Sequence, residues 1–107
     1  KQLRPLVRAD NEAEVQYWIA KSYSDAGITE QAIIEFLKVR YQCKQTKLPW
    51  GATALYEAGN GYRKLGNLDK AKEMFQLVVQ ERGATDNIGR AANAKIDEIN
   101  AEIEARS

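Results

Sequence analysis

The sequence predicts an all-α fold built from stacked helical hairpins, and three observations support this prediction. Identical residues recur 39 positions apart, as expected for an internal structural repeat. Apolar residues between the repeated positions follow a period close to 3.6, which is typical of amphipathic helices, and no stretch shows the strict alternation of a half-buried strand. The recurring pairs are Ala13/Ala52, Tyr17/Tyr56, Tyr23/Tyr62, Gly27/Gly66, Ala32/Ala71, Phe36/Phe75 and Val39/Val78.

The first hairpin is predicted over residues 11–45. Asp10 or Asn11 can cap its first helix, because a short side-chain acceptor satisfies a free backbone N–H at a helix start. Gly27 is predicted to end that helix, since glycine just past a helix end tolerates the left-handed conformation. A second helix is predicted from about Thr29. Its buried face is predicted to consist of Ala32, Ile33, Phe36, Leu37, Val39 and Tyr41.

The second hairpin and its linker are predicted over residues 46–83. Pro49 favours a break followed by a helix start, so the third helix is predicted to begin at Trp50. Asn67 is predicted to cap the fourth helix, and Gly83 to end it. The loops inside each hairpin are only two or three residues long, which forces antiparallel neighbours.

A last helix is predicted within residues 84–107, starting at Thr85 or Asp86. It carries one apolar stripe, and its other positions are almost all polar. A helix with one face to bury and one to leave in water is what the end of a repeat stack requires. The stripe consists of Ile88, Ala92, Ile96, Ile99 and Ile103.

Composition and the scarcity of reactive side chains argue against catalysis. The chain of 107 residues has a net charge of +1, and this near balance argues against a nucleic-acid domain. It contains no histidine, which removes Ser-His-Asp triads, Cys-His dyads and histidine metal sites. The single cysteine, Cys43, is predicted to be a structural thiol. Gly59 and Gly61 are predicted to lie in mid-helix, which excludes a phosphate-binding loop, and Gly59 is predicted to allow close helix packing.

Within each hairpin the repeated residues keep a fixed internal spacing. Unit one reads Ala20-x-x-Tyr23-x-x-x-Gly27-x-x-x-x-Ala32-x-x-x-Phe36, and unit two reads Gly59-x-x-Tyr62-x-x-x-Gly66-x-x-x-x-Ala71-x-x-x-Phe75. This pattern resembles the tetratricopeptide repeat (TPR) family. The resemblance implies a TPR-like α-solenoid of two helical hairpins plus a C-terminal capping helix, with residues 1–10 as a tail or the end of a preceding helix.

The repeat length departs from the family pattern. TPR units usually have about 34 residues, whereas the spacing here is 39. We expect the surplus to lengthen the second helix or its exit loop, near Cys43 to Leu48.

A narrower resemblance points to bacterial envelope proteins. The chain reads Tyr17-Trp18-Ile19-Ala20, then a long linker ending in Pro49-Trp50, then Ala54-Leu55-Tyr56-x-Ala58-Gly59. This order is similar to TPR segments of the periplasmic coordinator of the Tol–Pal system and of the lipoprotein of the outer-membrane barrel assembly machinery. It implies a periplasmic scaffold in an envelope complex, and favours the periplasm over the cytoplasm.

The family resemblance also implies which residues meet a partner, because the first helix of each TPR hairpin lines a concave groove. By register, the groove positions are Glu14, Tyr17, Lys21, Ser24, Asp25, Thr53, Tyr56, Asn60, Arg63 and Lys64. The residues predicted to bind a partner are Tyr17, Lys21, Tyr56, Asn60 and Arg63. Tyrosine suits such a surface because it offers a large apolar area and a polar tip at low entropy cost.

One known groove chemistry is not reproduced. Chaperone-binding TPR domains hold a C-terminal carboxylate with a set of Lys, Asn and Arg. Here Tyr17 stands where the first lysine should be, and Lys21 where the first asparagine should be. A chaperone-tail adaptor is therefore not expected.

The sequence as a whole predicts a non-enzymatic scaffold that binds a peptide or helix of a partner protein in a concave groove. It predicts no cofactor, no metal, no nucleic acid and no direct membrane insertion, and it allows a homo-oligomer. Two alternatives stay open. The chain can be a structural or self-association module of a larger TPR protein, or a regulatory domain of a larger enzyme.

Overall fold

The computed structural model describes residues 11–106, and these residues form five α-helices connected by turns and loops. The predicted all-α helical repeat fold is confirmed. The segment 1–10, predicted as a tail or the end of a preceding helix, and the alternative cap Asp10 lie outside the described residues. The helices are α1 (Glu12–Asp25), α2 (Thr29–Tyr41), α3 (Trp50–Lys64), α4 (Leu68–Arg82) and α5 (Asn87–Arg106).

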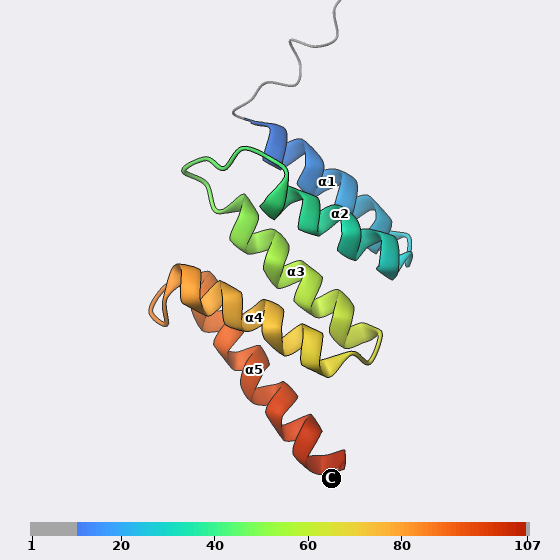
Figure 1. Ribbon diagram of the computed structural model, residues 1–107, viewed down its shortest axis with the longest axis vertical. Coiled ribbons are helices and arrows are strands. Elements are labelled where there is room, and N and C mark those ends of the chain that lie inside the picture. Colours follow the sequence, from blue (N-terminus) through green and yellow to red (C-terminus); the bar gives the residue numbers. More distant parts are fainter. Residues whose placement is uncertain (1–10, 107) are drawn as a thin grey trace, which may run out of the picture.

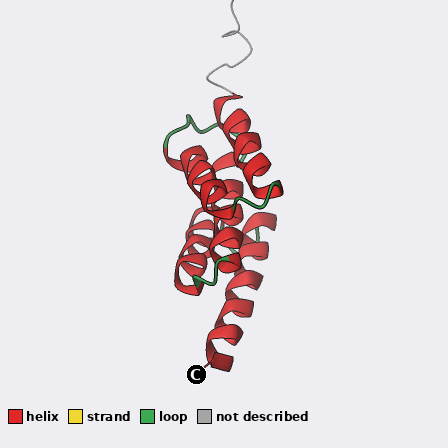
Figure 2. Cartoon of the chain, turned by 90° about the vertical axis from the view of Figure 1, so that its right-hand side faces the viewer, coloured by secondary structure: helices red, strands yellow, loops and turns green. Residues whose placement is uncertain are grey.

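The helices stack in chain order, as expected for a helical repeat. In Figure 1, α1 and α2 form the upper hairpin, α3 crosses the middle, and α4 and α5 lie below. The side view in Figure 2 shows the same succession of helices joined by short loops. Each helix packs mainly against its neighbours in sequence, with smaller contacts between α1 and α3 and between α3 and α5. This arrangement places α3 at the centre of the stack.

The turn inside each hairpin is built in the same way. Gly27 has φ 81° and Gly66 has φ 83°, so both adopt the left-handed conformation that glycine tolerates best. The backbone N–H of the next residue then reaches back to a tyrosine carbonyl, from Ile28 to Tyr23 at 2.9 Å and from Asn67 to Tyr62 at 2.9 Å. The predicted glycine stops are confirmed.

An aromatic pair joins the two helices of each hairpin. The ring centroids of Tyr17 and Phe36 lie 5.5 Å apart, and those of Tyr56 and Phe75 lie 5.3 Å apart. Both phenylalanines are fully buried. The two tyrosines therefore recur because they pack against these rings, which gives them a role in the fold that their positions in the sequence do not reveal.

Two glycines allow α3 to approach its neighbours closely. A Cβ atom at Gly59 would lie 2.8 Å from the Phe75 ring, which confirms the predicted close packing at that position. A Cβ atom at Gly61 would lie 2.7 Å from Ile33 Cγ1 of α2. Gly61, to which the sequence assigned no role, is thus required where α2 crosses α3.

The surplus residues of the long repeat lie in the loop between α2 and α3. Helix α2 ends at Tyr41, so the exit loop and not the helix is lengthened. The Gln45 side chain holds this loop by donating hydrogen bonds to the carbonyls of Val39 and Cys43, both at 2.9 Å. At its end, Trp50 packs against Tyr17 with ring centroids 5.3 Å apart.

The predicted buried face of α2 needs two corrections. Tyr41 was predicted to be buried but is 61% exposed, because it is the last residue of α2 and its ring lies against the Arg40 guanidinium, 5.2 Å from the ring centroid. Glu35 was not predicted to be buried, but only 8% of it is exposed. Its carboxylate accepts hydrogen bonds from Gln16 and Gln31, both at 2.7 Å.

The cap of α4 agrees with the sequence prediction, and of the two residues predicted to start the last helix, Thr85 and Asp86, it is Asp86 that caps α5. The Asn67 side chain accepts a hydrogen bond from the backbone N–H of Lys70 at 3.2 Å. The Asp86 carboxylate accepts from the backbone N–H of Ile88 at 2.9 Å and of Gly89 at 3.3 Å. Ala92 and Ile99 of the predicted stripe are fully buried, so α5 covers the end of the core with this face.

Candidate partner-binding groove

One face of α3 is open to solvent between the first hairpin and α5. We call its residues the α3 groove face. They recur every three or four positions, which places them on the same side of the helix. The α3 groove face consists of Thr53, Tyr56, Glu57, Asn60, Arg63 and Lys64.

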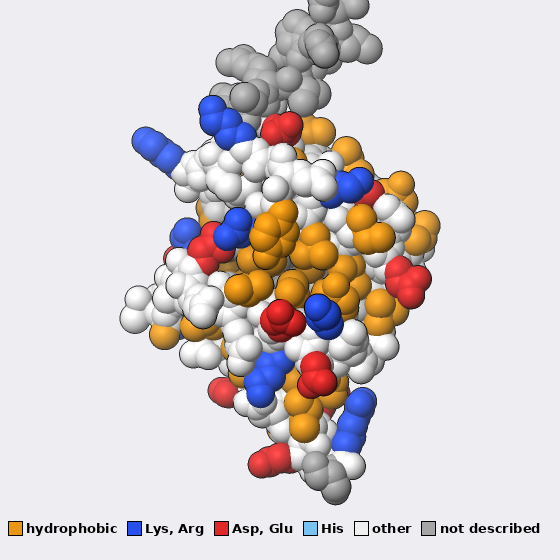
Figure 3. Space-filling model, in the orientation of Figure 1, with side chains coloured by type: hydrophobic (Ala, Val, Ile, Leu, Met, Phe, Trp, Pro, Cys, Tyr) orange, Lys and Arg blue, Asp and Glu red, His pale blue; other side chains and the backbone are white. Residues whose placement is uncertain are grey.

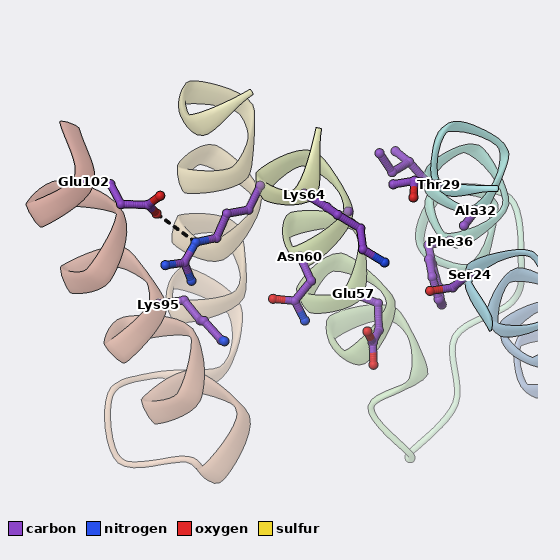
Figure 4. Close-up of a pocket in the computed structure, with 12 residues that line it drawn as sticks. Ser24, Thr29, Ala32, Phe36, Glu57, Asn60, Lys64, Lys95 and Glu102 are labelled. Carbon is purple, nitrogen blue, oxygen red and sulfur yellow. Dashed lines mark hydrogen bonds and ion pairs between the residues drawn. The ribbon is translucent and has the colours of Figure 1, made fainter. Parts of the chain in front are cut away.

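The larger hollow on this face has a volume of about 370 Å³. In Figure 4, Glu57, Asn60 and Lys64 project from α3, which lies between α5 on one side and α1 and α2 on the other. Ser24, Thr29, Ala32 and Phe36 form the wall of the first hairpin, and Lys95 and Glu102 come from α5. Helix α3 supplies Glu57, Asn60, Gly61, Arg63 and Lys64.

A second hollow of about 300 Å³ lies further toward the start of α3. It is formed by α3 and the first turns of α5, and its wall includes the apolar side chains of Ile88 and Ala91. Glu57 borders both hollows. The two hollows therefore lie next to each other along α3, with Tyr56 and Ile88 in the second hollow and Asn60 in the first, and we call them together the groove along α3.

An ion-pair cluster holds α5 against α3 at one side of the groove. The Arg63 guanidinium donates to Glu98 at 2.7 Å and to Glu102 at 2.9 Å. The hydrogen bond from Arg63 lowers the pKa of Glu98, and the same bond is the main cause that raises the pKa of Arg63. Arg63 therefore stabilises the packing of α5 against α3 and also lines the first hollow.

Tyr17 belongs to the core and lines neither hollow, with only 7% of the residue exposed. Burial, together with the charge of Glu57, raises the pKa of its hydroxyl to about 12. The hydroxyl is therefore protonated at neutral pH and donates to the Glu57 carboxylate at 3.3 Å. This bond fixes Glu57 at the border between the two hollows.

The five residues predicted to bind a partner are thus in different environments. Asn60 and Arg63 line the first hollow, and Tyr56 lines the second. Tyr17 is a correction: its ring belongs to the core between Phe36 and Trp50, because the hairpin packs around it. Lys21 lines neither hollow, and its ammonium lies 3.8 Å from Asp25 on the same helix.

The sequence analysis missed three charged groove residues, Glu57, Lys95 and Glu102. A polar side chain on an amphipathic helix is usually assigned to solvent, so nothing marked Glu57 or Glu102. Lys95 had a usable signal, because it lies 39 residues after Tyr56, which itself lies 39 residues after Tyr17.

Burial, with a smaller contribution from Glu12, raises the pKa of the Cys43 thiol, which opposes formation of a reactive thiolate. Within residues 11–106 no group of three His, Cys, Asp or Glu side chains could hold a metal ion. No helix in this part of the chain is long and apolar enough to cross a membrane.

The face that carries α2 and α4 has a different character. Figure 3 shows apolar side chains gathered near its centre. A hollow of about 390 Å³ lies between the start of α2 and the end of α3, with Ile33 and Ile34 on one side and Tyr62 and Leu65 on the other. The other residues that line it are Glu30 and Asn67, so it contains one acidic and no basic side chain, whereas the larger hollow along α3 contains both.

Comparison with protein families agrees with the repeat described above. Residues 53–82 match the family model of the tetratricopeptide repeat. The match covers most of α3 and all of α4, and therefore supports TPR character for the second hairpin. No curated protein and no solved structure matches the chain. TPR units are generally non-catalytic modules for protein–protein interaction, and the groove along α3 lies on a helix of the matched unit.

Proposed function

We propose that this domain binds a segment of a partner protein in the groove along α3. The observation that carries the proposal is the adjacency of the two hollows on either side of Glu57, which gives a surface longer than one side chain. The groove combines apolar wall residues with charged and amide side chains, as protein-binding surfaces do. The TPR match over the same helix supports an interaction module over an enzyme.

Site-specific photo-crosslinking in cells of the native source tests this function. A photo-reactive amino acid replaces Asn60, which lines the groove, or Gln76, an exposed polar residue of α4 that lines neither hollow of it. We expect crosslinks to a distinct partner protein from position 60 and not from position 76. Equal crosslinking from both positions, or crosslinks from neither, would contradict the proposal.

Self-association is a second candidate, and one observation favours it. Ile19 and Trp18 of α1 are 42% and 52% exposed, whereas Ala58, the residue 39 positions after Ile19, is fully buried. Helix α1 thus presents an apolar face at a position that α3 buries within the stack. If this face joins two copies, the molecular mass in solution should rise with concentration, and Ile19→Lys should abolish the rise. A monomer at all concentrations would rule this candidate out.

A role in a bacterial envelope complex is the more specific form of the binding proposal. It rests on the order of motifs from Tyr17 to Gly59 in the sequence, and no comparison supports it. Fractionation of the native source tests it, since recovery of the protein with cytoplasmic markers alone would contradict it. The alternative of a regulatory domain within a larger enzyme has no supporting feature in the groove.

A further inference from the structure

The charged residues of the groove are unevenly paired. Arg63 meets two carboxylates of α5, and Glu57 accepts a hydrogen bond from Tyr17. Lys64 and Lys95 also line the first hollow, yet neither lies within ion-pair distance of a carboxylate in the described part of the chain. The hydrogen bond from Arg63 and, to a smaller extent, the charge of Lys95 lower the pKa of Glu98, which is bound to Arg63 and forms no ion pair with Lys95.

These two lysines flank an amide. In Figure 4, the Asn60 side chain lies between Lys95 of α5 and Lys64 at the end of α3. Two ammonium groups and an amide N–H donor around one hollow suit a carboxylate, because hydrogen bonds to charged groups are the stronger ones. A second acidic side chain of the partner, placed nearer Glu57, would be repelled by the Glu57 carboxylate. The arrangement therefore favours a single acidic side chain at Asn60.

The neighbouring hollow suits an apolar side chain. Tyr56, Ile88 and Ala91 line it, and the ring of Tyr56 is backed by Phe75. Tyr56 and Asn60 are four residues apart on α3, which corresponds to about 6 Å along a helix axis. An extended chain covers about 6.6 Å in two residues. A partner segment lying along α3 in extended form would therefore place residues two positions apart in the two hollows.

We propose, building on the binding function above, that the partner is an extended protein segment with an internal Asp or Glu two residues from a large apolar side chain. The acidic side chain binds at Asn60 between Lys64 and Lys95. The apolar side chain fills the hollow beside Tyr56 and Ile88. The carboxylate belongs to a side chain and not to a chain terminus, because lining residues extend from Asn60 in both directions along α3, to Tyr56 on one side and to Lys64 on the other.

A peptide-display selection against the 107-residue chain tests this motif. Random twelve-residue peptides are selected, and the enriched ones are synthesised with blocked termini. We expect enrichment of a Leu, Ile or Phe two positions from an Asp or Glu. The double variant Lys64→Glu/Lys95→Glu should weaken binding of the selected peptide at least tenfold. Lys72→Glu is the matched control, because Lys72 lies on α4 and lines neither hollow, and it should leave the affinity unchanged.

The possible outcomes separate this inference from the proposed function. Peptides that bind at Asn60 but carry no acidic residue, or that tolerate the double charge reversal, would overturn the motif while leaving groove binding intact. Binding that requires a free C-terminal carboxylate would overturn the assignment to a side chain. The variant Asn60→Trp places a large side chain in the first hollow and should block binding there. If no selected peptide loses affinity for this variant, both the motif and the proposed groove function are overturned.

Discussion

The two hairpins share one backbone plan but differ in the pair of residues that joins their helices near the centre. In the first hairpin, the Gln16 amide donates to the Glu35 carboxylate at 2.7 Å and to its backbone carbonyl at 3.1 Å. The residues 39 positions later are Leu55 and Met74, both buried in the core. The same helical hairpin therefore accommodates a hydrogen-bonded polar pair in one copy and apolar packing in the other.

The difference shows which parts of the repeat are required. The glycine turn and the Tyr–Phe pair recur in both hairpins with nearly the same geometry. The central pair varies because a polar pair and an apolar pair are both stable in the interior, provided that every buried polar group is hydrogen-bonded. The buried Glu35 meets this condition, since Gln16, Gln31 and Lys38 all donate to it.

The shared aromatic pair should have the largest effect on stability. Phe36→Ala and Phe75→Ala each remove a fully buried ring, and we expect each to lower the free energy of unfolding by about 3–5 kcal/mol. Chemical denaturation followed by circular dichroism measures both. A loss below 1 kcal/mol at one position only would show that the two hairpins do not share this packing.

The central pair provides the sharper test of the comparison. Gln16→Leu alone leaves the Glu35 carboxylate buried with fewer donors, and we expect it to cost about 1–3 kcal/mol. The double variant Gln16→Leu/Glu35→Met copies the second hairpin, and should recover this loss because well-packed apolar residues often replace buried polar pairs without cost. Chemical denaturation of the unaltered protein, the single variant and the double variant under one condition measures the three free energies of unfolding. If the double variant is less stable than Gln16→Leu, the hairpins are not interchangeable here.

The hydrogen-bonded Gln16–Glu35 pair should also make the free energy of unfolding depend on pH in the acid range. Burial raises the pKa of Glu35, but the hydrogen bonds from Gln16, Gln31 and Lys38 outweigh it and hold the pKa below its ordinary value of 4.5. As the pH falls, Glu35 is therefore protonated at a higher pH in the unfolded chain than in the folded protein. This stabilisation is complete above about pH 4.5 and is lost as the pH falls through the folded pKa.

The pH dependence can be measured against the apolar double variant. Thermal unfolding between pH 3 and pH 7 should show a smaller acid loss for Gln16→Leu/Glu35→Met than for the unaltered protein. Parallel curves for the two proteins would show that Glu35 does not contribute to the acid transition.

The caps of the second helices should give the smallest effect. Asn67 caps α4 through its side chain, whereas Ile28 holds the equivalent position before α2 without a side-chain hydrogen bond. We expect Asn67→Ala to cost about 1 kcal/mol and Ile28→Asn to gain a similar or smaller amount. Melting temperatures of the two variants check this, and a destabilising Ile28→Asn would show that the exposed isoleucine has a packing role.

The sequence predicts those features that depend on backbone conformation. Glycine stops, the Asn67 and Asp86 caps, the place of the long linker and the all-α class all follow from local rules and from the 39-residue spacing. The buried carboxylate of Glu35 does not follow, because its donors lie on two helices and the pairing exists only after folding. The role of Gly61 also depends on a crossing helix, through Ile33.

The groove was predictable on one hairpin only. All five register positions of the second hairpin line the two hollows, because α3 is flanked by neighbours on both sides. Of the equivalent positions in the first hairpin, only Ser24 reaches the larger hollow. Tyr17 instead contacts Trp18, Phe36 and Trp50, a cluster that no repeat rule describes since neither tryptophan recurs.

The central claim is that the groove along α3, and not the apolar face over α2 and α4, binds the partner segment. A titration of isotope-labelled protein with a selected peptide, followed by backbone amide shifts, tests it directly. We predict shifts concentrated at Asn60, Gly61, Lys64 and Lys95. Shifts concentrated at Ile34 and Leu65 on the opposite face, with the groove amides unmoved, would contradict the account.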